Sequence, residues 1–182
     1  LNLIGDFGGG GMLLALGIVS ALLETKSSGE GQVIDAAMTD GSSLLMTMMY
    51  SMQQSGFWNL ERQTNLLDGA AHFYDTYECK DGKYISIGSI EPQFYDLLCE
   101  KAELSPDQFG DQMKRDAWKE KKDLISKVFL TKSRDEWCDL MEGTDVCFAP
   151  VLDMSEAPRH PHNIARKTFI ELEGVTQPAP AP

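Results

Sequence analysis

Hydrophobic residues fill one continuous stretch near the start of the chain. Residues 12–23 are apolar apart from glycine and one serine, and no charged side chain occurs between Asp6 and Glu24. A helix that is apolar on all sides is typical of a buried position in a protein core. We therefore expect a buried helix that begins at about Met12.

Four consecutive glycines, at positions 8–11, precede this helix. Each glycine costs about 0.8–1 kcal/mol relative to alanine inside a helix, so a purely structural need would be met better by alanine. Glycines at a helix N-terminus leave backbone N–H groups accessible, and the helix dipole favours a negative ligand there. We expect Gly8, Gly9 and Gly10 to contact a substrate.

Asp6 precedes the glycines, with Phe7 alone between them. On the residue alone, a helix N-cap is the commoner role for an aspartate in this place. The adjacent glycine run favours a functional site instead, and Asp6 is the strongest candidate for a catalytic residue.

A second helix is predicted over residues 36–54, because Met38, Leu45, Met49 and Met52 recur at steps of seven, four and three. A short strand at residues 32–35 precedes it, with Asp35 as the expected cap. Methionine side chains form soft surfaces that accept varied apolar ligands, so Met38, Met49 and Met52 are candidates for substrate binding. Core filling explains the same methionines nearly as well.

The second half of the chain has the pattern of an α+β domain. Residues 73–79 and 83–88 predict two strands joined by an Asp81-Gly82 turn. Helices are expected from Pro92 to about residue 102, over 116–130, and over 133–141, where Ser133 and Glu136 form a capping box. Residues 147–152 predict a further strand, whose Pro150 is typical of a sheet edge.

The composition excludes several classes of function. The net charge is −12 and the pI is about 4.6, so nucleic acids and anionic membrane surfaces are not expected partners. Residues 7–23 approach the length of a membrane span, but the glycines and the absence of a basic flank favour a buried helix. The four cysteines lack C-x-x-C spacing and indicate reduced intracellular thiols, and no metal site is expected.

Five sequence blocks resemble one known family. They are LNLIGDFGGG at residues 1–10, GEGQVIDAAM at 29–38, NLLDG at 65–69, IEPQFY at 90–95 and TDVCFAPV at 144–151. In this order they are similar to the α-methylacyl-CoA racemases, a group within the family III CoA-transferase superfamily. The resemblance covers essentially the whole chain but only the middle of the proteins in that group.

The resemblance implies a 1,1-proton transfer that interconverts (R)- and (S)-2-methylacyl-CoA through an enolate. Asp6 falls on the family's catalytic aspartate, and Asn2 falls on the asparagine that accompanies it. Glu91 falls on the glutamate that supports a catalytic histidine, which lies in a G-H-D motif before this chain. Coenzyme A would be part of the substrate, with no separate cofactor, and the 182 residues alone are expected to be inactive.

The resemblance also implies an architecture and a cellular setting. Residues 1–57 would be an α/β remnant of the large CoA-binding domain, with 58–71 as a linker, 72–172 as the small α+β domain and 173–182 as a tail. Two subunits would interlock as a homodimer. A peroxisomal or mitochondrial location is expected, or a cytoplasmic one in a bacterium.

Two alternatives remain open from the sequence. In a family III CoA-transferase, Asp6 would attack the thioester and carry the acyl group covalently. In a non-catalytic interaction fragment, Asp6 would be a helix cap and the glycines would only ease packing.

Overall fold

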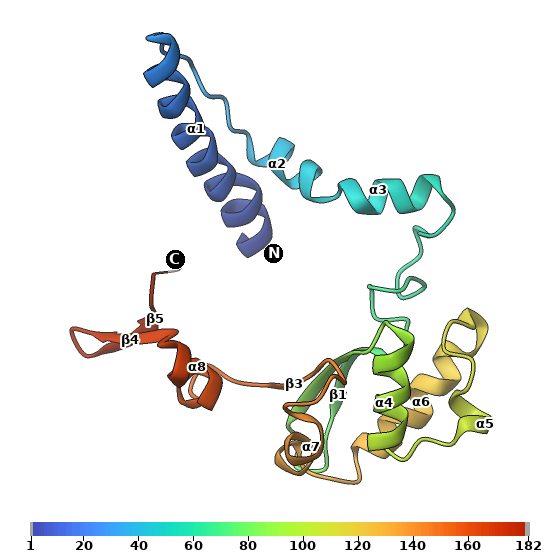
Figure 1. Cartoon of the computed structure of the whole chain (residues 1–182). Helices are drawn as coiled ribbons and strands as arrows, with labels where there is room; N and C mark the ends of the chain where they lie inside the picture. Colours follow the sequence, from blue (N-terminus) through green and yellow to red (C-terminus); the bar gives the residue numbers. More distant parts are fainter. Residues whose placement is uncertain (1, 181–182) are drawn as a thin grey trace. The chain divides into compact units, whose positions relative to one another are not determined.

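The computed structural model describes residues 2–180, which divide into two compact units, residues 2–61 and 62–180 (Figure 1). Within residues 2–61 the regular elements are all helices. The second unit contains both helices and sheets, as the sequence predicts for that half of the chain.

The first unit begins with a helix that starts earlier than the sequence predicts. A π-helix, η1 (Leu3–Met12), continues directly into α1 (Leu13–Ser28), which ends at Gly29 in the left-handed conformation with φ of 77°. The predicted start at Met12 is therefore wrong, because the four glycines lie inside the helix. π-Helical turns are rare and occur frequently at functional sites.

The first helix is also not buried as the sequence predicts, because α1 has no buried residue within this unit. The apolar side chains of α1 point in all directions. The helix that packs on this segment, α2 (Met38–Leu45), covers mainly η1 and leaves α1 exposed within the unit. By length and composition, the helix Leu3–Ser28 could also cross a membrane, with a mean hydropathy of 1.6. The core helix of a soluble protein passes the same test.

Two further predictions for this unit are wrong. Residues 29–37 are irregular, without the strand expected at 32–35, and α2 begins after Ala37 with no cap from Asp35. The second helix is divided at Met46 into α2 and α3 (Thr47–Gln54). The Thr47 hydroxyl donates to the Leu44 carbonyl over 2.6 Å, and such side-chain bonds bend or interrupt helices.

The second unit is built on a three-stranded antiparallel sheet. Strands β1 (Tyr74–Glu78), β2 (Tyr84–Gly88) and β3 (Phe148–Val151) lie in the order β1-β2-β3. The predicted hairpin is confirmed, with Gly82 at φ of 74°, and Pro150 lies on an edge strand opposite Ile85. A separate two-stranded sheet pairs β4 (Phe169–Leu172) with β5 (Val175–Pro178).

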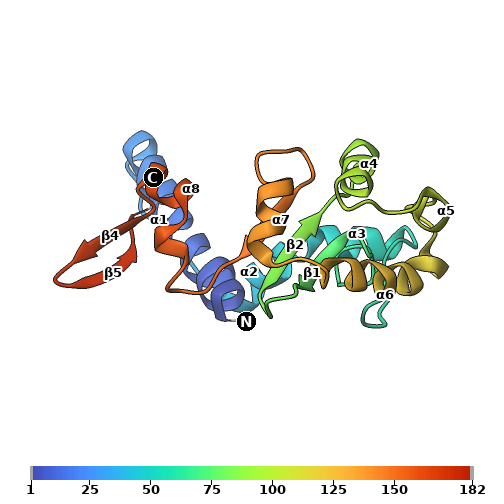
Figure 2. The ribbon, with the colours of Figure 1, turned by 90° about the horizontal axis from the view of Figure 1, so that it is seen from below.

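Helices pack against the larger sheet: α6 lies against β1 (Figure 2), and α7 lies against β3. The predicted helices are confirmed as α4 (Pro92–Lys101), α6 (Trp118–Phe129) and α7 (Arg134–Met141). The capping box joining Ser133 and Glu136 is present at the start of α7. The remaining helical segments are α5 (Pro106–Phe109), η2 (Arg115–Ala117), η3 (Ala157–Arg159) and α8 (Pro161–Arg166).

The core of the second unit lies between this sheet and the helices. Its fully buried side chains include Phe73, Ile85, Leu98, Phe129 and Trp137. Each such side chain contributes about 1.5–3 kcal/mol through burial. This core fixes the ends of β2 and α4, between which Glu91 lies.

Candidate functional site

Asp6 is an exposed residue in the first turn of η1. It does not cap the helix, because the N-cap position belongs to Asn2, which makes no capping side-chain hydrogen bond. Asn2 is also exposed and lies four residues before Asp6. The interpretation of Asp6 as a simple N-cap therefore does not fit the structure.

The glycines of η1 have separate roles. A Cβ atom on Gly9 would lie 2.7 Å from both the backbone nitrogen and the hydroxyl of Ser42, and Gly9 is the buried residue of this helix. Gly9 is thus required for close packing on α2. A Cβ atom on Gly8 or Gly10 would make only ordinary contacts with Leu45 or Met38.

The methionines selected from the sequence do not share one helical face. Met38 lies in the first turn of α2 beside Gly10, and 46% of its surface is exposed. Met49 and Met52 are half-buried on α3, beyond the break at Met46. Of the three, Met38 is the one placed next to the glycines of η1.

Glu91 occupies the N-cap position of α4, with Pro92 as the first helical residue. Its carbonyl oxygen accepts hydrogen bonds from the N–H groups of Phe94 and Tyr95, each over 3.0 Å. The Glu91 side chain is exposed and makes no capping hydrogen bond. The backbone therefore fixes the residue, while its carboxylate remains available to a partner.

Cys147 lies close enough to Glu91 to be affected by its charge. Burial raises the pKa of the Cys147 thiol, and the negative charge of Glu91 raises it further. Cys147 has a positive φ of 58°, which is uncommon for a residue other than glycine. Burial and the charge of Glu91 thus both favour the neutral thiol.

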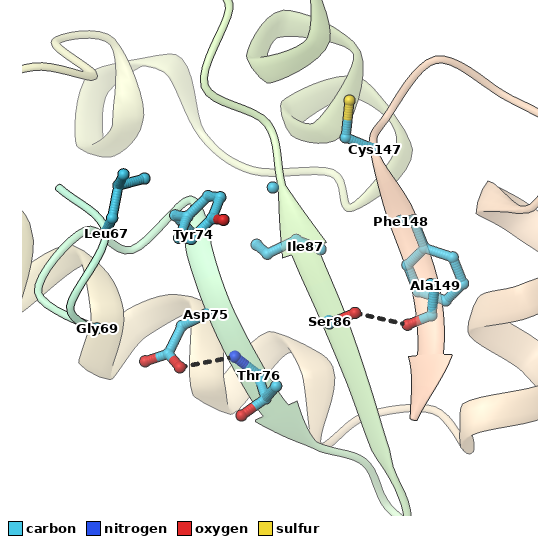
Figure 3. A pocket seen from close by; sticks show the side chains of 11 residues that line it. Leu67, Gly69, Tyr74, Asp75, Thr76, Ser86, Ile87, Cys147, Phe148 and Ala149 are labelled. Carbon is cyan, nitrogen blue, oxygen red and sulfur yellow. Dashed lines mark hydrogen bonds between the residues drawn. The ribbon is translucent and has the colours of Figure 1, made fainter. Parts of the chain in front are cut away.

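A cavity of about 450 Å³ lies along the strands next to Cys147. Figure 3 shows Tyr74 and Ile87 on neighbouring strands of this cavity, with Cys147 just before β3. The Ser86 hydroxyl donates to the Ala149 carbonyl over 3.2 Å and so joins β2 to β3 within the cavity wall. The mixture of apolar and hydroxyl groups suits part of an organic ligand better than a free ion.

The NLLDG block forms the turn that closes one end of this cavity. The Asp68 carboxylate accepts from the backbone and the side chain of Asn65, over 2.9 and 2.8 Å. Burial raises the pKa of Asp68, but these hydrogen bonds outweigh it and lower the pKa below its usual value. The Lys122 ammonium group then ties the turn to β1 by donating to the Gly69 carbonyl and the Asp75 carboxylate.

None of the three histidines is placed as an obvious proton donor. His72 is fully buried, with Nε2 2.7 Å from the Tyr95 hydroxyl, and burial lowers its pKa to about 3. The His160 ring lies 3.1 Å from the Glu142 carboxylate, and His162 is exposed. Among residues 2–180, no cluster of three potential metal ligands is present.

The predicted site residues are divided between the units. Asn2, Asp6, the three glycines and the three methionines belong to the first, and Glu91 belongs to the second. The sequence alone does not identify Gly41 and Ser42, the residues of α2 against which η1 packs. It also does not identify Gln112, which holds the segment before Glu91. A glycine inside a predicted helix, here Gly41, is a sequence signal for close helix packing.

Comparison with known proteins gives consistent matches. The sequence profile of CoA-transferase family III matches residues 2–182. The chain is 45% identical to the alpha-methylacyl-CoA racemase of Mus musculus and 44% identical to that of Homo sapiens, each over 183 residues. These alignments cover 100% of this chain and 48% of each relative, so the chain spans about half of their length.

Solved structures show the same fold. A crystal structure of Rv3272 from Mycobacterium tuberculosis matches with a TM-score of 0.70 at 20% identity. The match covers 94% of this chain and 45% of the solved chain. At this level of identity the likeness concerns the fold alone.

Proposed function

Because the chain belongs to CoA-transferase family III, we propose that it is part of an α-methylacyl-CoA racemase, which interconverts (R)- and (S)-2-methylacyl-CoA thioesters. The observation that carries this proposal is the identity of 44–45% to two racemases over the whole chain. CoA-transferases belong to the same family, and α-proton exchange distinguishes the two reactions.

The proposed reaction is a proton transfer at the carbon next to the thioester carbonyl. One group removes the α-proton, the electron pair moves onto the thioester oxygen to form an enolate, and an acid on the opposite face returns a proton. Such a pair needs opposed protonation states that are tuned towards the working pH. Asp6 is the proposed group on one face.

The second face would be served by a histidine outside these 182 residues. Glu91 would orient its imidazole ring and stabilise the charged form, as a buried aspartate does in a serine protease. The exposed Glu91 carboxylate, which makes no capping bond, is compatible with this role. The exposed Asp6 carboxylate and its neighbour Asn2 are likewise accessible to a ligand.

The substrate would meet η1 through Gly8, Gly10 and Met38. Gly9 supports this surface from behind, because it packs on Ser42. The proposal includes a homodimer in which other parts of the protein cover the apolar helix Leu3–Ser28. That helix would then be part of a protein core, and the close packing of its N-terminal half on α2 supports this assignment.

Exchange of the α-proton in deuterated water tests the proposal. The complete protein should incorporate deuterium into both enantiomers of a 2-methylacyl-CoA and convert each into the other. In a CoA-transferase, hydroxylamine should instead trap an acyl group on Asp6 in the presence of a second acid. A trapped adduct without α-proton exchange would overturn the racemase assignment and establish the transferase.

A further inference from the structure

The side chain of Gln112 bridges the two backbone carbonyls that immediately precede Glu91. Its Nε2 atom lies 2.9 Å from the Ser89 oxygen and 2.9 Å from the Ile90 oxygen. An amide NH₂ group carries two protons, so it can donate one to each carbonyl while remaining neutral. The bridge therefore fixes the chain just before the N-cap of α4.

Gln112 is itself held by the core of the second unit. Its backbone carbonyl accepts from the indole N–H of Trp118 over 2.8 Å. Trp118 is buried and packs edge to face against Phe73, with 5.8 Å between the ring centroids. The backbone carbonyl of Phe73 accepts a hydrogen bond from the Ser89 N–H over 3.0 Å. Gln112, Trp118, Phe73 and Ser89 are thus joined in a closed ring of contacts.

A second set of contacts fixes the same segment from the side of β3. Ser89 is fully buried, and its hydroxyl donates to the Val146 carbonyl over 2.5 Å. The Ile90 N–H donates to the Gly88 carbonyl over 2.9 Å. The backbone on the N-terminal side of Glu91 is thus restrained residue by residue.

We propose that Gln112 is a positioning residue for Glu91, holding its backbone so that the exposed carboxylate stays directed at the group it orients. This inference rests on the proposed function, because it assigns a catalytic purpose to the bridge. The physical reason is that the Glu91 side chain makes no capping bond, so its place depends on the backbone that carries it. Misplacement of a reacting group by about 1 Å can reduce the rate about 10²-fold.

The restraint of the backbone by Gln112 can be tested without measuring enzyme activity. Gln112→Met keeps the length of the side chain and removes both donors, while Gln108→Met on the exposed side of α5 makes the same chemical change elsewhere. Hydrogen–deuterium exchange of the complete protein should accelerate in the peptide covering residues 89–95 for Gln112→Met alone. Equal protection in both variants and the wild type would overturn the bridge.

The catalytic part is tested by a double-mutant cycle with Glu91→Gln. Gln112→Met should lower kcat for α-proton exchange by up to about 10²-fold, for the same enantiomer that Glu91→Gln affects more, with little change in KM. In the Glu91→Gln background it should cost little further, because the two act through one group. A full additional loss there, or equal loss for both enantiomers, would show a merely structural role.

The two proposals fail in different ways. If the wild-type protein exchanges no α-proton, the proposed function fails and the positioning role fails with it, while the deuterium protection of residues 89–95 still decides whether the bridge exists. If the wild type exchanges and the cycle is additive, only the positioning role is wrong.

Discussion

The carbonyl group of Gly9 lies directly against the Cα atom of Gly41. A Cβ atom on Gly41 would come within 1.8 Å of the Gly9 oxygen and 2.8 Å of a methyl carbon of Leu13. Gly9 and Gly41 are also the buried residues of η1 and α2. The contact of two glycines therefore sets the distance between the helix that carries Asp6 and its support.

Gly41→Ala should separate these helices, because a backbone oxygen cannot move aside as a flexible side chain can. Overpacking of this kind costs about 1–3 kcal/mol, so the melting temperature of the complete protein should fall. Activity should fall as well, since Asp6 is on the displaced helix. Gly11→Ala is the matched control, because its added Cβ would meet the Asp6 carbonyl only at 3.6 Å. If both variants melt alike, the contact is unimportant.

Asp6→Asn should lower α-proton exchange by about 10²–10⁴-fold, the range for loss of a general base. The amide keeps the shape of the side chain and loses its basicity, so binding of the CoA ester should persist. Isothermal titration with a non-exchanging CoA thioester and exchange kinetics measure the two effects separately. Near-normal turnover would return Asp6 to a structural role.

Local signals in the sequence were sufficient for most of the second unit. The Asp81-Gly82 turn, the capping box at Ser133 and the proline after Glu91 each act within a few residues, and the structure confirms the elements they predict. The sequence does not predict the hairpin of β4 and β5, because the prolines at 178, 180 and 182 favour a tail over a strand.

Contacts between segments that are distant in the sequence cannot be predicted from such local signals. Gly9 and Gly41 are 32 positions apart in the sequence, and the glycine run alone indicates an accessible helix end and not a packing contact. The buried helix was inferred from composition, but the elements that pack on it within residues 2–61 are too few to cover it. The bridge from Gln112 to Ser89 likewise depends on tertiary structure.

His72 should make the stability depend on pH. Burial first, and then the positive charge of Lys121, lowers its pKa from 6.5 to about 3. A group whose pKa is depressed in the fold contributes fully above its unfolded pKa, so stability is lost as the pH falls below about 6.5. For one proton, the free energy of unfolding falls by about 1.4 kcal/mol per pH unit, which amounts to a loss of about 2 kcal/mol at pH 5.

Urea unfolding of the complete protein between pH 7 and 5 measures this effect. His72→Gln should flatten the dependence in that window, because glutamine does not titrate. His162→Gln, at an exposed position, should leave it unchanged. An unaltered slope in His72→Gln would mean that other groups bind the protons on unfolding.

Glu91→Gln should separate a catalytic role from a structural one. An acid at a helix start contributes only about 0.3–1 kcal/mol, and this side chain makes no capping bond, so thermal stability should change little. Glu100→Gln, on an exposed position of the same helix, removes an equal charge and should affect neither stability nor activity.

The loss of activity in Glu91→Gln should be unequal for the two substrate enantiomers. Glu91 is proposed to support only the histidine, whereas Asp6 serves the other face of the α-carbon independently. Removing the carboxylate therefore weakens the histidine as a base and slows α-proton abstraction from the enantiomer whose proton faces it. Initial rates of exchange in deuterated water, measured for each pure enantiomer before racemisation, give the ratio. Equal losses from both enantiomers would show that Glu91 acts on the whole site and not on one face.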